Sequence, residues 1–173
     1  MENQKLPCSD SPTDIYLLPG ELYFAAANTR IHTILGSCIS ISLWHPLLRI
    51  GGMCHFMLPS RGKAAGASLD GRYADEAIQL IQREIKKNHT HPGAYQVKLF
   101  GGGNMFQTFC SGKAMDVASD NIKAARALLD NGEFHIAAED VGGKGHRRII
   151  FDLYDGNVWV KRDKTLDRLD TAS

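Results

Sequence analysis

The sequence has no excess of charge of either sign. Its 173 residues carry 20 lysines and arginines against 19 aspartates and glutamates, so the formal net charge is only +1. An even balance creates no broad positive field to attract nucleic acid or an anionic membrane surface. We therefore expect no nucleic-acid partner, and we expect any partner to be recognised through local shape.

Long hydrophobic runs are also missing. No stretch approaches the roughly 18 apolar residues that a membrane helix requires. The first residues, MENQKLP, lack the apolar segment of a signal peptide. These absences predict a cytoplasmic protein with no direct membrane insertion.

Cysteines are few, and their spacing indicates no metal site. Cys8, Cys38, Cys54 and Cys110 are widely separated and form no C-x-x-C unit, which favours reduced thiols over a disulfide framework. The segment GGGN at 101–104 lacks the G-K-[ST] ending of a phosphate loop, so it indicates a turn. We expect neither a metal nor a cofactor.

The chain has the length and composition of one folded domain. Hydrophobic residues make up 43% and charged residues 23% of the sequence, which is ordinary for a globular protein. We expect a disordered polar arm at 1–14, a single domain at 15–162 and a loose charged tail at 163–173.

The order of predicted elements indicates an α+β fold. Two amphipathic helices are predicted, one from near Asp70 to 88 and one at 118–130. Strands are predicted at 20–25, 33–44, 49–58, 95–100, 134–141, 148–154 and 157–161. This mixture favours a layered sandwich of mainly antiparallel β-sheet with two main helices packed against it.

The strongest candidate for chemistry is the pair Cys38 and His55. Strict apolar and polar alternation after Cys38 predicts a half-buried strand, which returns through a loop at 45–48. If Trp44 pairs with Arg49, Cys38 lies directly opposite His55, with Cβ atoms about 4.5–5.5 Å apart. A thiol and an imidazole at this distance can act as nucleophile and base.

The same register points Cys54 to the opposite face, into the core. A disulfide between Cys38 and Cys54, as a redox sensor would need, is therefore disfavoured. The alternative to catalysis is a buried structural thiol beside a core histidine. Gly36 and Ser37 favour catalysis, because a tight turn can present backbone N–H groups to an oxyanion.

Four motifs, in this order, resemble the CheD family of chemoreceptor glutamine deamidases: LGSC at 35–38, GGMCHFMLP at 51–59, FGGGNMF at 100–106 and EDVGG at 139–143. The resemblance implies a layered fold related to the catalytic domains of deamidating toxins, with Cys38 as nucleophile and His55 as base. It also implies a threonine shortly before the cysteine as the third member. Thr33 is the candidate, and His32 occupies the alternative position.

The resemblance further implies a substrate and partners. Family members convert glutamines on the cytoplasmic helices of methyl-accepting chemotaxis receptors to glutamate, which regulates adaptation, and they bind a CheC-type phosphatase. Loops 60–67 and 142–147 are candidates for the rim of an open cleft over those helices. The competing hypothesis is a non-enzymatic adaptor that binds receptors or the phosphatase without turnover.

Overall fold

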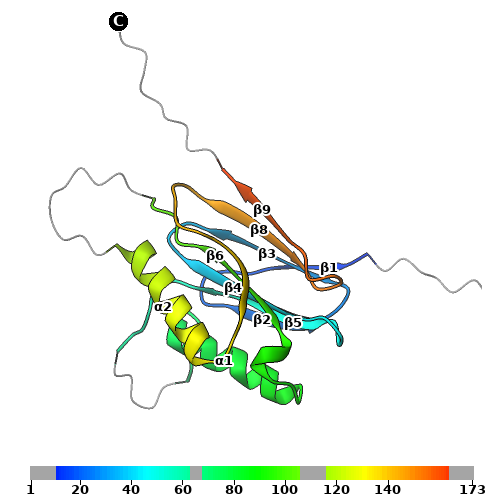
Figure 1. The fold of residues 1–173 in the computed structure, drawn as a ribbon. Helices are drawn as coiled ribbons and strands as arrows, with labels where there is room; N and C mark the ends of the chain where they lie inside the picture. Colours follow the sequence, from blue (N-terminus) through cyan, green and yellow to red (C-terminus); the bar gives the residue numbers. More distant parts are fainter. Residues whose placement is uncertain (1–10, 63–67, 106–115, 164–173) are drawn as a thin grey trace, which may run out of the picture.

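The computed structural model describes residues 11–62, 68–105 and 116–163. In these ranges two β-sheets and two helices form three stacked layers (Figure 1). The four-stranded sheet contains, in spatial order, β1 (Thr13–Tyr16), β3 (Thr29–Leu35), β8 (Arg147–Asp152) and β9 (Val158–Arg162). β1 pairs with β3 in parallel, and the other pairs are antiparallel.

The five-stranded sheet is the middle layer. It contains, in spatial order, β2 (Leu22–Ala26), β5 (Ile50–Phe56), β4 (Ile39–His45), β6 (Gln96–Gly101) and β7 (Ile136–Val141). Only its β6–β7 pair is parallel. The helices α1 (Ala74–Lys87) and α2 (Val117–Asn131) pack together on its outer face. The predicted α+β sandwich of mainly antiparallel sheet is confirmed.

Two apolar layers hold the three structural layers together. Between the five-stranded sheet and the helices, Ile41 and Leu99 pack against Ile81 and Leu129. Between the two sheets, Leu35, Met53, Phe100 and Phe151 are almost completely buried. Burial of an aliphatic or aromatic side chain stabilises a fold by about 1.5–3 kcal/mol.

Both helices differ in detail from the sequence prediction. α1 begins at Ala74 rather than near Asp70, because the backbone of Tyr73 is extended (φ −110°, ψ 132°). The N-terminus of α2 is capped by the Asp116 carboxylate, which accepts a hydrogen bond from the Ser119 N–H at 3.2 Å. The buried face of α2 includes a polar residue, Asn121, between Ala118 and Ala125.

The prediction of one strand at 33–44 is wrong. Residues 29–35 form β3 in the four-stranded sheet, whereas residues 39–45 form β4 in the five-stranded sheet. The chain crosses between the sheets at Gly36, Ser37 and Cys38, which we call the nucleophile turn. The crossing places Thr33 on a sheet that faces His55, instead of on the same hairpin.

The predicted hairpin register is wrong by two residues. The loop occupies 46–49, with Arg49 at a positive φ of 50°, and Trp44 pairs with Gly51. The direct partner of His55 is consequently Ser40 rather than Cys38. Because side chains alternate with a period of two, an even shift leaves every residue on its predicted face.

The ends of the chain bear on the predicted domain limits. β1 begins at Thr13 and β9 ends at Arg162. Residues 1–10 and 164–173 lie outside the described residues, and so does the 63–67 part of the predicted rim loop. The limits 1–14, 15–162 and 163–173 therefore stay a prediction. Across the described residues, neither helix has the length and apolar character needed to cross a membrane.

Candidate active site

The nucleophile turn is anchored through its backbone. The carbonyl of Gly36 accepts a hydrogen bond from the Gly103 N–H at 2.7 Å, and that of Cys38 accepts one from the Gly102 N–H at 2.8 Å. Gly101 has a φ of 113°, and a Cβ there would lie 2.1 Å from the Cys38 carbonyl oxygen. Only glycine fits at 101, so the glycine run serves to hold Cys38.

His55 lies on β5 with its side chain between the two sheets, and only 2% of it is exposed. Its backbone is held at the start of β2. The His55 N–H donates to the Glu21 carbonyl at 3.0 Å, and the His55 carbonyl accepts from the Gly20 N–H at 2.7 Å. The imidazole is thereby held in a fixed place in the interior.

Thr33 joins the two sheets at His55. Its Oγ1 donates a hydrogen bond to the Leu17 carbonyl at 3.0 Å and lies 2.9 Å from His55 Nδ1. A hydroxyl has a single proton, and a carbonyl can only accept. Since that proton goes to Leu17, His55 Nδ1 must carry its own proton and donate to Thr33. The lone pair of the neutral imidazole is then on Nε2, as a general base requires.

His32, the alternative third member, points away from this site. It lies on the outer face of the four-stranded sheet, where its Nε2 is 2.6 Å from the Asp14 carboxylate and its ring stacks on Tyr16. Neighbouring residues of a strand face opposite sides. The structure therefore brings Thr33, and not His32, to His55.

Cys38 and His55 share the layer between the sheets without a direct hydrogen bond. Cys38 is half-buried and packs against the inter-sheet core, two residues before the cross-strand partner of His55. His55 Nε2 is buried and has no hydrogen-bond partner in the described part of the chain. Cys38 lies one residue beyond the end of the β4–β5 ladder, at a position diagonal to His55, and diagonal positions of this kind lie within side-chain reach. Catalytic contacts commonly tighten only when substrate is bound.

Burial keeps both groups neutral at rest. Burial raises the pKa of the Cys38 thiol, although its own backbone N–H opposes this shift. Burial lowers the pKa of His55 to about 4, and the negative charge of Glu21 opposes that shift. The resting pair is thus a thiol and an imidazole, which matches general-base activation of the thiol rather than a preformed ion pair.

Cys54 is separated from this site, as predicted. Its side chain is completely buried among the residues between β5 and the helices. Burial raises the pKa of Cys54 to about 12, so this thiol stays protonated at neutral pH. Cys38 is therefore the more reactive of the two cysteines that the structure describes.

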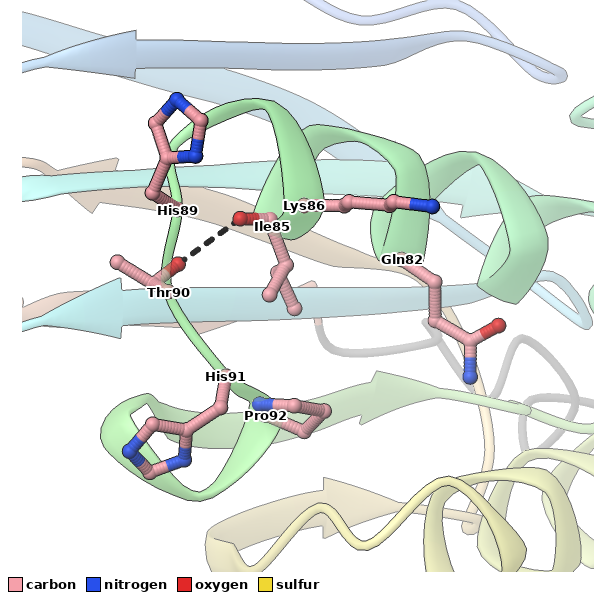
Figure 2. A pocket seen from close by; sticks show the side chains of 7 residues that line it. All are labelled: Gln82, Ile85, Lys86, His89, Thr90, His91 and Pro92. Atoms are coloured by element: carbon pink, nitrogen blue, oxygen red, sulfur yellow. Dashed lines mark hydrogen bonds between the residues drawn. The ribbon is translucent and has the colours of Figure 1, made fainter.

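A cavity of about 450 Å³ has Thr33 and His55 in its lining and lies against β3, β8 and the segment that follows β1. Its wall is mostly apolar and includes Leu17, Pro19 and Ile149. A second hollow, of about 540 Å³, lies at the C-terminal end of α1 (Figure 2). Figure 2 shows the rings of His89 and His91 pointing away from each other on either side of Thr90, whose Oγ1 donates to the Ile85 carbonyl at 3.1 Å.

The loop at 142–147 lies next to the nucleophile turn. A side chain at Gly36 would meet Met105 Sδ at 3.0 Å and His146 Nδ1 at 3.6 Å. Asn104 donates its N–H to the Gly143 carbonyl at 2.7 Å. The loop therefore borders the site, where a rim was expected.

The described residues contain no group of three histidine, cysteine or acidic side chains that could hold a metal ion.

The sequence did not predict the contacts of two supporting residues. Asn121 is fully buried and donates to the carbonyls of Ser37, at 3.1 Å, and Met57, at 2.7 Å. A polar residue in the apolar stripe of a helix is the signal that could have revealed it. Arg147 is 1% exposed and donates from Nε to Asp140 Oδ1 at 2.9 Å, which links the two sheets. No local sequence pattern indicates the ion pair between Arg147 and Asp140.

Comparison with known proteins identifies the family. Residues 57–162 match the family model described as CheD chemotactic sensory transduction. A protein of Pseudomonas fluorescens (strain SBW25) named probable chemoreceptor glutamine deamidase CheD is 52% identical over 150 residues, covering 86% of this chain and 84% of the relative. A relative from Dechloromonas aromatica, with CheD 3 in its name, is 48% identical, covering 85% and 86% of the two chains.

A more distant relative carries the same deamidase name. A Leptospira interrogans protein with the same deamidase name, CheD 1, is 41% identical and covers 88% of this chain and 95% of its own. Among solved structures, the Bacillus licheniformis hypothetical protein YfiH is 10% identical, with a TM-score of 0.44 and coverage of 68% of this chain and 49% of its own. On the identities and the family model, this chain belongs to the CheD family.

Proposed function

We propose that this chain is a protein-glutamine deamidase that converts glutamine side chains of chemoreceptors to glutamate, with Cys38 as nucleophile and His55 as base. The observation that carries the proposal is the relay from His55 Nδ1 through Thr33 Oγ1 to the Leu17 carbonyl. This relay leaves Nε2 as the free basic nitrogen on the face that Cys38 shares. The relatives named chemoreceptor glutamine deamidase support the choice of substrate.

The first half-reaction forms a thioester. His55 Nε2 takes the proton from Cys38 Sγ, and the thiolate attacks the carbon of the substrate carboxamide. Negative charge develops on the carboxamide oxygen, where backbone N–H groups of the nucleophile turn can stabilise it. The protonated His55 then gives its proton to the leaving nitrogen, the C–N bond breaks, and ammonia departs.

The second half-reaction restores the enzyme. His55 takes a proton from water, and the resulting hydroxide attacks the thioester carbon. The C–S bond breaks, Cys38 recovers its proton from His55, and the side chain leaves as glutamate. Thr33 holds the imidazole tautomer in both halves, as a third group does in related dyads. The net change consumes one water and releases one ammonia for each glutamine.

This activity implies a cellular setting. The substrate glutamines belong to the cytoplasmic helices of methyl-accepting chemotaxis receptors, so we place the protein in the cytoplasm. Each reaction adds one negative charge to a receptor helix, through which the protein would regulate chemotactic adaptation. A CheC-type phosphatase is the second proposed partner, and its test is co-purification with this chain and a change in the deamidation rate.

The direct test is mass mapping of a purified chemoreceptor cytoplasmic fragment after incubation with the protein. We expect ammonia release and conversion of specific glutamines to glutamate by the wild type, and neither by Cys38→Ala or His55→Ala. The matched control is Cys54→Ala, which removes the other described cysteine and should retain activity. Full activity in Cys38→Ala would refute the proposal.

The adaptor hypothesis makes the opposite prediction in cells. If the protein only binds receptors or the phosphatase, Cys38→Ala would restore chemotaxis to a strain that lacks the gene. If deamidation is the function, the variant fails to restore chemotaxis although it accumulates to the wild-type level.

A further inference from the structure

The ladder between β4, which follows the nucleophile, and β5, which carries the base, ends before it reaches Cys38. The β4–β5 ladder ends at the pair Ile39 and Phe56. Beyond this pair, the Met57 N–H donates to the Arg72 carbonyl at 2.9 Å, while the Cys38 carbonyl is held by the glycine run. The ladder therefore does not itself set the position of Cys38 relative to β5.

Asn121 joins the strands at this point. Its Nδ2 donates one proton to the Ser37 carbonyl at 3.1 Å and the other to the Met57 carbonyl at 2.7 Å. Both acceptors are carbonyl oxygens. If the amide were flipped, Asn121 Oδ1 would face these two oxygens, and three acceptors would meet with no proton between them. Asn121 is completely buried, and its Oδ1 has no hydrogen-bond partner within the described ranges. One amide group thus links the segment before the nucleophile to the segment after the base.

This contact also orients a backbone donor at the nucleophile. The Ser37–Cys38 peptide is trans, as are the other described peptide bonds. In a planar trans peptide the C=O and the N–H point in opposite directions. Because the Ser37 carbonyl is held by Asn121, the Cys38 N–H points away from α2. This N–H also opposes the rise that burial causes in the pKa of the Cys38 thiol. A backbone N–H beside the attacking sulfur is where an oxyanion donor is needed.

We propose that Asn121 is a positioning residue, which holds the Ser37–Cys38 peptide so that the Cys38 N–H faces the developing oxyanion and keeps the nucleophile turn beside the base strand. The inference rests on the proposed deamidase function and adds to it a residue on α2. Gly102 and Gly103 hold the neighbouring carbonyls through backbone groups. Asn121 adds a side-chain contribution to this anchoring, and this contribution can be removed by substitution.

The test compares two variants of Asn121 with a control on the same helix. Asn121→Leu removes both donors at similar volume, and Asn121→Ala removes them with less crowding. Leu129→Ala is the control, because Leu129 is equally buried on α2 but packs two turns away from the Asn121 contacts. All four proteins are compared at a temperature at which circular dichroism shows them folded.

Two measurements are made on each protein. The first is kcat and KM for deamidation of a chemoreceptor fragment. We expect kcat to fall by about 10- to 100-fold in a folded Asn121 variant with KM within about threefold of wild type, since oxyanion donors act on the transition state. Leu129→Ala should keep its kcat. An Asn121 variant with the kcat of wild type would overturn the inference.

The second measurement is the rate at which iodoacetamide alkylates Cys38, followed by mass spectrometry of its peptide. Loss of the oriented N–H should slow alkylation by several-fold, whereas general loosening of the structure should accelerate it. Faster alkylation in both Asn121 variants would overturn the inference. If the wild type deamidates no fragment, the proposed function fails, and the alkylation rates still decide the role of Asn121.

Discussion

At the scale of single residues, the site depends on where one proton lies. The Leu17 carbonyl can only accept a hydrogen bond, so it takes the Thr33 proton and makes Thr33 the acceptor for His55 Nδ1. A backbone carbonyl on the segment between β1 and β2 therefore selects the imidazole tautomer. The resulting chain of hydrogen bonds crosses from one sheet to the other, and it leaves Nε2 as the basic nitrogen.

The relay predicts different effects for two substitutions of Thr33. Thr33→Val keeps the shape but removes the hydroxyl, so we expect kcat for deamidation to fall by about 10²-fold or more. It also leaves the Leu17 carbonyl without a hydrogen-bond donor, so we expect the free energy of unfolding to decrease by about 1–3 kcal/mol. Thr33→Ser keeps the hydroxyl and should stay within several-fold of wild type. Steady-state kinetics and urea unfolding measure both effects, and equal kcat in Thr33→Val and wild type would contradict the relay.

At the scale of elements, the site is made where four segments meet. The nucleophile turn, the glycine run at 101–104 and the loop at 142–147 are tied together by backbone hydrogen bonds, and α2 contributes Asn121. β7 and β8 add an ion pair between the sheets. Burial raises the pKa of Asp140, but hydrogen bonds from Arg162 and Arg147 outweigh it, and its pKa is lowered overall.

The ion pair predicts unequal effects of removing its members. Asp140→Asn leaves the buried Arg147 guanidinium without a counter-charge, so we expect a loss of about 3–5 kcal/mol in unfolding free energy. Arg162 also bonds Asp140 but is 57% exposed. Arg162→Gln should therefore cost about 0–1 kcal/mol. Urea unfolding compares the two variants, and an Asp140→Asn protein as stable as Arg162→Gln would show that Arg147 does not depend on this carboxylate.

Much of the element pattern was predictable from the sequence, because each element has a local signal. The apolar stripe of α1 and the hairpin of β8 and β9 depend on residues close together in the chain. The predicted two-residue connection at 155–156 is wrong, because β8 ends at Asp152 and β9 begins at Val158. The faces of Cys38 and Cys54 followed from alternation, which survives an even register shift. The shift itself came from the loop, where Arg49 adopts a positive φ that no local rule requires.

Other features depend on contacts between distant segments. The split between β3 and β4 arises because β3 pairs with β8, more than a hundred residues later in the chain. The contacts of Asn121 with Ser37 and Met57 span 84 and 64 residues. Alternation within a strand and periodicity within a helix cannot report such contacts, which appear only in the folded structure.

At the scale of the whole molecule, the buried imidazole couples folding to pH. The pKa of His55 is about 4 in the folded protein, against an ordinary value of 6.5. As pH falls below 6.5 the unfolded chain binds a proton at this residue before the folded protein does, so the free energy of unfolding decreases. The stabilising contribution of neutral His55 is therefore complete above pH 6.5 and is lost as the pH falls to 4.

This coupling predicts a loss of about 3 kcal/mol in unfolding free energy between pH 7 and pH 4. Urea unfolding at a series of pH values measures it, with His55→Gln as the control that lacks the titrating group. The lowered pKa of Asp140 acts at lower pH, because its contribution is lost only below its ordinary pKa of 3.8. If His55→Gln loses as much unfolding free energy between pH 7 and pH 4.5 as the wild type does, the pH dependence comes from other groups.

The central claim is that Cys38 carries the acyl intermediate. The most direct measurement is intact-mass and peptide mass spectrometry of the enzyme after rapid acid quenching during turnover of a chemoreceptor fragment. If Cys38 is the nucleophile, a covalent adduct of the fragment forms on the Cys38 peptide. The adduct is sensitive to hydroxylamine, as a thioester is, and it is absent from Cys38→Ala. Sustained deamidation by Cys38→Ala, or an adduct at any other residue in place of Cys38, would contradict the role of Cys38 as nucleophile.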